Sequence, residues 1–383
     1  MKSKIWLSSP HIGKNELNYV NEAFETNWIA PLGPHVNAFE EGLQQQTQTK
    51  LAAALSSGTS AIHLALILLG VKSDDFVICQ SITFSASANP ITYQGASPVF
   101  IDSELDTWNM DPMLLRTALK EAQENGKMPK AIIPVHLYGM PAKMYEIMTI
   151  AKEFGVPVIE DAAEALGSNI NEKPCGGFGD FGVLSFNGNK IITTSGGGAL
   201  VSNDGEMIKK ARYLATQARD PAPHYQHSQI GYNYRLSNVL AGIGRGQLEV
   251  LGDRINSRRN NHKRYMEYFS KYNQAGFNIQ FQEEPNGYYS NRWLTCILVD
   301  PSLNKGLTRE DIRLIMETEN IETRPLWKPM HQQPVFTSSK NYLNGVSDKL
   351  FENGLCLPSG SNLTEDEFDR IFNCFDNIFS SHK

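Results

Sequence analysis

The sequence predicts an α/β protein with a large domain on a mostly parallel β-sheet and a smaller α+β domain after it. From about residue 50 to residue 205, short β-rich runs alternate with helical patterns, as they do in parallel sheets that carry helices on both faces. Beyond about residue 250 this alternation stops and a long polar helical pattern begins. We therefore place an N-terminal arm and the large domain at residues 1–250, and the small domain at residues 251–383.

Short apolar segments in the first part have the composition of buried strands. They are Asp75–Ser81, Pro98–Asp102, Ala131–His136, Pro157–Asp161, Val183–Phe186 and Gly198–Ser202. Between the second and third of them, Asp111 and Pro112 open a helical pattern that Gly126 closes, with proline in the first turn and glycine beyond the end. Strands separated by such helices pair in parallel, so this region predicts the large sheet.

The second part predicts a different architecture. We expect a polar helix over residues 254–272, a strand over 293–299 and two helices that begin at Thr308 and Thr364. An acidic residue follows each of these threonines three positions later, which is the pattern of a capping box. The last helix repeats aromatic and isoleucine residues at helical spacing, and we interpret this stripe as core.

Basic residues recur along the predicted helix at 254–272. We interpret them as a solvated helix face, and contact with a diphosphate is the alternative. They are Arg254, Arg258, Arg259, Lys263 and Arg264.

The composition excludes several classes of function. A formal net charge of -6 argues against general affinity for nucleic acid or an anionic membrane, so any phosphate must be bound locally. The five cysteines form no CxxC pair and have no histidine at metal-binding spacing, so we expect inert, buried thiols and no metal site. The N-terminus lacks a signal-type apolar stretch and no segment is long enough to span a bilayer, which predicts a cytoplasmic protein.

A run of small residues, Ser56 to Ala61, precedes a helical pattern. The start of a helix exposes free backbone N–H groups and the positive end of the helix dipole, which together bind phosphate without lysine or arginine. The alternative is that these residues only cap the helix.

Asp161 ends a buried strand, at the sheet edge where open α/β folds place ligands. A carboxylate there can keep a pyridinium nitrogen protonated, which makes the ring an electron sink. The alternative is that Asp161 caps a following helix.

Lys190 lies between Ser185 and a glycine-rich run at 196–198. A lysine forms a Schiff base when a desolvated or cation-rich pocket frees its amine, and small neighbours leave room for a bulky cofactor. A solvated, inert loop lysine is the alternative.

These segments, in this order, resemble the DegT/DnrJ/EryC1/StrS sugar aminotransferases, which are fold-type I pyridoxal-phosphate enzymes with a seven-stranded type of sheet. The matching motifs are SSGTSA, SITFSASANPI, PVHLYG, VIEDAAEALGS, SFNGNKIITTSGGGAL and GYNYRLSN. The resemblance runs nearly end to end. The opening LSSPHIG and NWIAPLGPHVNAFE look most like the branch that makes bacillosamine-type amino sugars.

The resemblance implies roles for individual residues. Lys190 would hold pyridoxal 5'-phosphate as a Schiff base and later move a proton between the cofactor and the sugar carbon. Asp161 would pair with the pyridine nitrogen and Phe84 would stack on the ring. Phosphate contacts are implied for Thr59, Ser60 and Ser185. Near the ring hydroxyl, where the family often has glutamine or histidine, this chain has Glu164, which favours the bacillosamine-like branch and leaves its contact open.

The resemblance also implies a homodimer with shared active sites, because Asn233 would complete the phosphate site of the neighbouring subunit. Contacts with the sugar nucleotide are implied for Trp28, Arg235, Lys328 and His331. For the basic residues of the proline-broken loop 324–331, the alternative is an exposed position without a ligand.

The activity implied is a two-stage, ping-pong transamination. L-glutamate would donate its amino group to the cofactor, and a UDP-linked 4-keto-6-deoxy hexosamine would accept it at C4. A sugar dehydratase of the same family is disfavoured, because members of that type replace the lysine with histidine, whereas Lys190 is present. A regulator on the same fold would need a DNA-binding extension, for which no residues remain before the first motif. An unrelated phosphate-binding α/β domain would leave the pairing of Asp161 and Lys190 unexplained.

Overall fold

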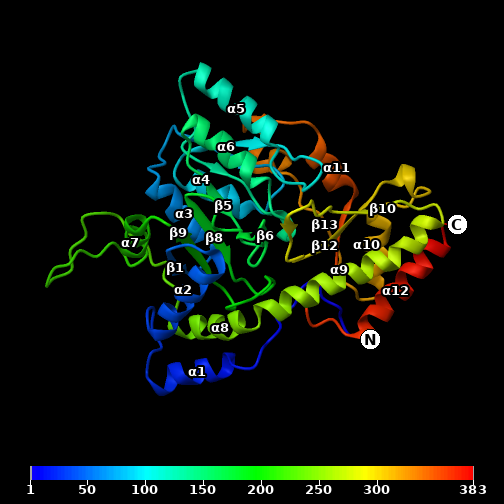
Figure 1. Cartoon of the computed structure of the whole chain (residues 1–383), viewed down its shortest axis with the longest axis horizontal. Helices are drawn as coiled ribbons and strands as arrows, with labels where there is room; N and C mark the ends of the chain where they lie inside the picture. Colours follow the sequence, from blue (N-terminus) through cyan, green and yellow to red (C-terminus); the bar gives the residue numbers. More distant parts are fainter. Residues whose placement is uncertain (1, 383) are drawn as a thin grey trace.

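The chain is built around a mostly parallel sheet, within residues 2–382 that the computed structural model describes (Figure 1). Two groups of strands, β1-β9-β8-β5 and β4-β2-β3-β14, are joined by bridges between Ile132 and Val158 and between Val135 and Asp161. The strands are β1 (Leu51–Leu55), β2 (Phe76–Gln80), β3 (Ser97–Ile101), β4 (Ile132–Ile133), β5 (Ile159–Asp161), β8 (Phe181–Ser185), β9 (Gly198–Ser202) and β14 (Asn341–Tyr342). The predicted fold class is confirmed.

The pairing pattern places the carboxyl ends of several strands at one edge. β8, β5, β4, β2, β3 and β14 pair in parallel, whereas β9 is antiparallel to both β8 and β1. Open parallel sheets bind ligands at this edge.

Helices bury both faces of the sheet. Along β1, Ala52 and Ala54 belong to one hydrophobic cluster and Ala53 and Leu55 to another, as the alternation of side chains in a strand requires. The helices of this part are α1 (Glu16–Glu25), α2 (Pro34–Thr47), α3 (Gly58–Leu68), α4 (Asn89–Tyr93), α5 (Pro112–Glu124), α6 (Met144–Phe154), α7 (Gly205–Leu214) and α8 (Asn238–Glu249). The buried side chains of α3 and α7 pack in the cluster on one face of the sheet, and those of α2 pack in the cluster on the other face.

The C-terminal part packs helices on a four-stranded antiparallel sheet of order β10-β12-β15-β13. Its elements are α9 (Leu251–Gln274), β10 (Ile279–Phe281), β12 (Thr295–Val299), α10 (Arg309–Thr318), β13 (Arg324–Pro325), α11 (Val346–Asn353), β15 (Gly354–Leu357) and α12 (Glu365–Ser380). A further small sheet joins β6 (Asn169–Ile170), β7 (Lys173–Pro174) and β11 (Tyr288–Tyr289). The aromatic stripe of α12 is buried, so its interpretation as core is confirmed.

Both predicted capping boxes are complete. The Thr308 and Thr364 hydroxyls accept the N–H of Asp311 and Glu367, whose carboxylates accept the threonine N–H in return. Asp111 caps α5 without such a box, its carboxylate accepting the N–H groups of Met113 and Leu114.

Several sequence-based expectations need correction. β1 was not predicted, because LAAAL lacks the β-branched residues that mark strands. The strand expected over residues 131–136 is reduced to Ile132–Ile133 and an isolated bridge at Val135, because Pro134 between them has no N–H to donate. No helix follows Asp161; the chain makes turns there, so the alternative role as a helix cap is wrong.

The prediction that the basic residues of α9 form a solvated helix face is also wrong in part. Arg254 and Arg258 are 7% and 1% exposed. Their guanidinium groups donate to main-chain oxygens of other segments, namely His11, Ile12, Trp293 and Ser359. Lys263 is exposed as expected. The two arginines are therefore internal links between segments.

The division at residue 250 stays a prediction. Val250 does separate α8 from α9. Several contacts cross the division: for example, Ile5 bridges to Ile321 and packs in the C-terminal core, and β14 pairs with β3 of the large sheet.

The five cysteines are free and buried, as predicted. Among residues 2–382, no helix combines the length and the apolar character needed to cross a bilayer.

Candidate active site

A cavity of about 650 Å³ lies at the carboxyl edge of the large sheet, a size typical of small-molecule sites. Residues of the N-terminal arm and the C-terminal part, among them Leu7, Trp293 and Trp327, complete its wall. Six of the predicted site residues line it: Thr59, Phe84, Asp161, Glu164, Ser185 and Lys190. Segments more than 100 residues apart in the chain are thus brought together as the motif order implied.

The start of α3 forms one end of the cavity. Ser57 caps this helix, its Oγ accepting the Ser60 N–H at 3.0 Å. The first N–H groups of a helix have no partner within it, and they lie beside the Thr59 and Ser185 hydroxyls that also line the cavity. Gly58 lets this turn approach β8 closely, since an added Cβ would lie 3.2 Å from the Ser185 Cβ. Such a site suits a phosphate.

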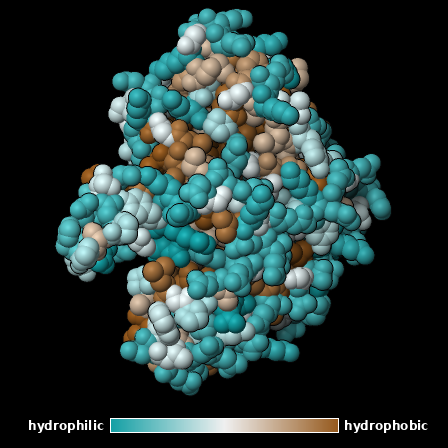
Figure 2. Space-filling view, turned by 60° about the vertical axis from the view of Figure 1, so that its left-hand side comes forward, coloured by the Kyte–Doolittle hydropathy of each residue, from teal (hydrophilic) through white to brown (hydrophobic). Residues whose placement is uncertain are grey.

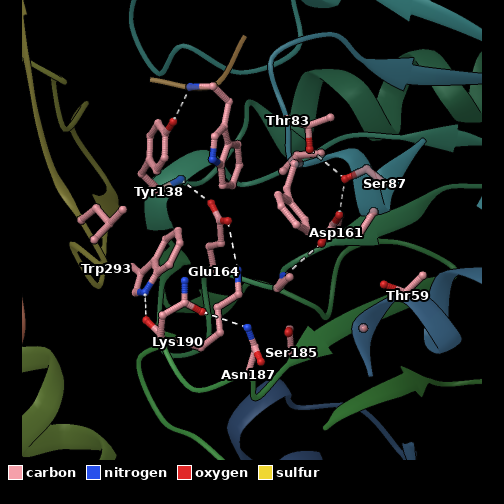
Figure 3. A pocket seen from close by; sticks show the side chains of 18 of the residues that line it. Thr59, Thr83, Ser87, Tyr138, Asp161, Glu164, Ser185, Asn187, Lys190 and Trp293 are labelled. Carbon is pink, nitrogen blue, oxygen red and sulfur yellow. Dashed lines mark hydrogen bonds and ion pairs between the residues drawn. The ribbon is translucent and has the colours of Figure 1, made fainter. Parts of the chain in front are cut away.

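Asp161 is the last residue of β5, and main-chain hydrogen bonds to Pro134 and His136 fix its backbone. Its Oδ2 accepts the Ser87 hydroxyl at 2.6 Å, and its Oδ1 accepts the Ala163 N–H at 3.1 Å. The Ser87 hydroxyl lies 2.7 Å from that of Thr83 (Figure 3). Two donors thus orient a carboxylate that is 5% exposed.

Lys190 lies in the loop between β8 and β9. Main-chain hydrogen bonds from Phe186 to Gly197 and from Thr194 to Phe186 close this loop. The Lys190 side chain is 11% exposed, and its Nζ lies 4.3 Å from the centre of the Trp293 ring. Its partner is Glu164, with Nζ and Oε1 3.1 Å apart (Figure 3).

Glu164 is 3% exposed on its side chain. Burial raises the pKa of its carboxyl, and the charge of Lys190 and the Tyr138 N–H, 2.8 Å from Oε2, act in the opposite direction. The carboxyl is therefore held between the amine and a fixed main-chain donor.

A hydrogen-bond network in and behind the cavity wall holds the main chain beside Lys190. The Asn189 carbonyl accepts both the Ser8 hydroxyl and the Trp293 indole N–H, each at 2.7 Å. Arg258 donates in turn to Ser8 Oγ and to the Trp293 carbonyl. Segments from three regions of the chain thus converge on the loop of the lysine.

Sequence reasoning missed several residues of this site. Ser87 and Thr83 stand within the motif SITFSASANPI, and Tyr138 within PVHLYG, so the resemblance contained them without indicating a role. Trp293 and Trp327 had no sequence signal, because each is an isolated aromatic residue that only the fold brings to the cavity.

Four predicted residues lie outside the cavity wall and keep their roles only as predictions. Ser60 is buried behind it, its hydroxyl 2.8 Å from that of Ser57. Trp28 is 47% exposed, and Asn233 and Lys328 are exposed. Trp28, Asn233 and Lys328 are therefore accessible for contact with another molecule.

Arg235 and His331 also lie outside the cavity wall, and each is already paired inside the chain. The Arg235 side chain is 4% exposed, and its guanidinium lies 3.0 Å from Glu40. His331 contacts the Ser81 hydroxyl through Nδ1 at 2.7 Å and Asp348 through Nε2 at 2.9 Å. Their contacts with the substrate therefore stay predictions as well.

One group of side chains has the composition of a metal site. His136, Glu160 and Cys175 lie close together and are buried. However, Nε2 of His136 is 2.8 Å from Glu160 Oε1, and both oxygens of Glu160 accept N–H groups of residues 176–179. We interpret this group as an anchor for that loop.

Comparisons with known proteins agree with this geometry. The sequence model of the DegT/DnrJ/EryC1/StrS aminotransferase family matches residues 10–376. EpsN of Bacillus subtilis (strain 168), named a pyridoxal phosphate-dependent aminotransferase, is 55% identical over 383 residues, which are 99% of this chain and 97% of EpsN. The GDP-perosamine synthase of Escherichia coli O157:H7 is 34% identical over 371 residues, 97% of each chain. Among solved structures, Spr1654 of Streptococcus pneumoniae, named a sugar aminotransferase, PLP-form, matches with a TM-score of 0.88 and 26% identity over 100% of both chains.

Proposed function

Because this chain belongs to the DegT/DnrJ/EryC1/StrS aminotransferase family, we propose that it moves the amino group of L-glutamate to C4 of a nucleotide-linked 4-keto-6-deoxy sugar. The enzyme is a pyridoxal phosphate-dependent sugar aminotransferase. The observation that carries the finer proposal is the presence of Lys190, Asp161 and the α3 terminus around one cavity.

The residues of the cavity fit pyridoxal phosphate. The N–H groups at the start of α3 and the hydroxyls of Thr59 and Ser185 would hold the phosphate. Asp161, oriented by Ser87 and Ala163, would hold the ring nitrogen, and Phe84 would cover a ring face. When bound, the cofactor supplies an electron sink for charge that develops on the substrate carbon.

Lys190 would supply the nucleophilic amine and later the base. Its Nζ lies against the face of Trp293 and beside Glu164, which limits where the amine can point. The closed loop between β8 and β9 restricts the main chain from which it projects. Lys190 can therefore accept a proton from a substrate carbon on one face of the site and return it there.

For the acceptor, we propose a UDP-linked 4-keto-6-deoxy hexosamine. The relative named GDP-perosamine synthase supports a nucleotide-linked sugar as the class of substrate. Lys328 is exposed on the loop that follows Trp327, a residue of the cavity wall, and would reach the diphosphate. Trp28 would contact the nucleotide or the sugar.

We also propose a homodimer in which each subunit completes the other's phosphate site through Asn233. The segment that follows α7 projects from the body of the molecule (Figure 1), and Tyr225 and Ile230 within it are 78% and 82% exposed. On this side of the molecule, hydrophobic surface is visible among polar groups (Figure 2). Such surface, together with exposed Trp28 and Ile29, suits contact with a second copy. Five buried free thiols support a place in the reducing cytoplasm.

The first experiment is the glutamate half-reaction. Protein reconstituted with pyridoxal phosphate should show a visible absorbance band that moves to shorter wavelength when L-glutamate is added, with release of 2-oxoglutarate. Borohydride should fix the cofactor mass to the peptide that contains Lys190. Lys190→Ala should lose this linkage, whereas Lys209→Ala, at a solvent-exposed side chain, should keep it. If the reconstituted protein shows no visible band and borohydride links no cofactor to Lys190, the transaminase mechanism is excluded.

The second experiment identifies the acceptor. UDP-, dTDP- and GDP-linked 4-keto-6-deoxy sugars are offered to the amino form of the enzyme, and the product is analysed by mass spectrometry and NMR for an amine at C4. Preference for a dTDP- or GDP-linked sugar would correct the nucleotide, and an amine at another carbon would correct the regiochemistry. Lys328→Ala should raise KM for the sugar nucleotide without changing the glutamate half-reaction.

A further inference from the structure

Glu164 occupies an unusual position among the cavity residues, because its two oxygens face different partners. Oε2 accepts the main-chain N–H of Tyr138 at 2.8 Å, and Oε1 faces Lys190 Nζ at 3.1 Å. The side chain is 3% exposed, so water does not compete strongly for either oxygen. One oxygen is thus hydrogen-bonded to the backbone, and the other faces the amine of Lys190 (Figure 3).

The donor to Oε2 is built into a rare backbone conformation. Tyr138 has φ of 56° and ψ of 21°, in the left-handed region that a bulky residue seldom adopts. Its side chain is 1% exposed, and its hydroxyl accepts the Trp327 N–H at 2.9 Å. Strained conformations persist where the surrounding structure fixes them, and they gather at functional sites. Here the result is a rigid N–H aimed at Glu164.

Charges around Glu164 leave Lys190 as its counterion. Asp161 is the other carboxylate that faces it and adds repulsion. Burial raises the pKa of Tyr138 and of Cys296, so neither adds a negative charge near neutral pH, and Cys356 lies beside Cys296 as a free thiol. Among residues 2–382, Lys190 is the one cation in an ion pair with Glu164. A neutral Lys190 would leave an uncompensated buried anion, which is costly, so the proton and the charge of the two groups are linked.

We propose that Glu164 and Lys190 share one proton and that Glu164 is a catalytic residue of this enzyme. When the Lys190 amine must be free, an N–H bond at Nζ breaks and an O–H bond forms at Oε1. When Lys190 takes a proton from a substrate carbon, the carboxylate stabilises the ammonium ion that results. This proton transfer needs no further reactant and involves no oxidation or reduction. This inference rests on the proposed function, in which Lys190 is the nucleophile and base.

The test uses the protein without cofactor. Lysines are labelled with a pulse of acetic anhydride at pH 8, and the rate at Lys190 is read from its peptide by mass spectrometry. Glu164→Gln keeps the size of the side chain and removes its charge. The variant replaces the charged oxygen that lies 3.1 Å from Nζ with an uncharged amide, which weakens the hydrogen bond that holds the amine, so we expect Lys190 to react about 10-fold faster. Glu322→Gln, at a carboxylate that also lines the cavity but pairs with Arg324, should leave the rate unchanged.

A Lys190 rate in Glu164→Gln equal to that of the parent protein would overturn the proposal, provided that circular dichroism confirms the fold. If Glu164→Gln does not fold, Glu164→Asp gives the answer, because it retains the charge but withdraws it from Nζ by one methylene. An intermediate acceleration supports the shared proton, and an unchanged rate overturns it. In the active enzyme, Glu164→Gln should also lose one limb of the pH profile of kcat. Failure of the protein to bind pyridoxal phosphate would end the proposed function without altering the labelling result.

Discussion

Gly198 offers a direct test of how the end of the cavity that we propose to hold the phosphate is built. An alanine Cβ at this position would lie under 3.0 Å from Gly58 N and from the carbonyl carbon and oxygen of Ser57. All three are backbone atoms, so no side-chain rotation relieves the overlap. Overpacking of this kind costs about 1–3 kcal/mol. We expect the Ser57–Gly58 turn to move away from β9 and to carry the start of α3 with it.

The displacement should weaken cofactor binding as well as folding. Loss of one charge-assisted hydrogen bond to the phosphate is worth roughly 1.5–3 kcal/mol, which raises the Kd for pyridoxal phosphate about 10- to 100-fold. The Kd is measured by titration of the cofactor-free protein, followed by absorbance, with urea unfolding alongside. Gly188→Ala is the matched control, because an added Cβ there meets nothing within 4 Å. If Gly198→Ala binds the cofactor as tightly as Gly188→Ala, the close approach of β9 and α3 is not what shapes this site.

Three further changes test the energetics of the C-terminal part. Thr364→Ala removes the cap of α12 and should lower the free energy of unfolding by about 1 kcal/mol, whereas Thr364→Ser should retain it; equal urea midpoints for both would contradict the capping box. Burial lowers the pKa of His262 from 6.5 to about 3. Between these two values the unfolded chain binds a proton at His262 that the folded chain does not bind, so stability falls as the pH falls from 6.5 to about 3. Between pH 6 and pH 4, the free energy of unfolding of His262→Leu should therefore fall by about 1.4 kcal/mol less per pH unit than that of the parent protein. Parallel curves of unfolding free energy against pH for parent and variant would refute this. Arg258→Met leaves the Trp293 and Ser359 carbonyls without their donor and should destabilise the protein by about 3 kcal/mol or more in thermal or urea unfolding; a change under about 1 kcal/mol would show that these bonds are replaced by others.

The large sheet and the inner wall of the cavity were open to prediction because local patterns encode them. The apolar run at 156–159 leads into β5, which ends at Asp161, and the small residues at 56–61 open a helix, so each motif fixes its own local structure. The resemblance then fixes their order around the cofactor. Lys190, Asp161 and the start of α3 line one cavity for this reason.

Other positions depend on partners that no local pattern reveals. Arg235 looks like an accessible ligand in a loop motif, yet Glu40, almost 200 residues away, neutralises it in the interior. His331 is likewise satisfied on both nitrogens by Ser81 and Asp348. Arg258 reads as one of several solvated charges on a polar helix, because its acceptors lie on segments that meet only in the folded chain. Burial of a charge is a property of the tertiary structure.

The same long-range contacts explain why the active site depends on most of the chain. The loop of Lys190 is held at the Asn189 carbonyl by Ser8 from the N-terminal arm and by Trp293 from the C-terminal part, and Arg258 of α9 donates to both. A lysine must be placed within a fraction of an ångström to act first as nucleophile and then as base. The large domain alone supplies the sheet edge and the phosphate end of the cavity, but not these supports. The placement of one amine therefore requires contacts from both ends of the sequence, from Ser8 as well as from Trp293.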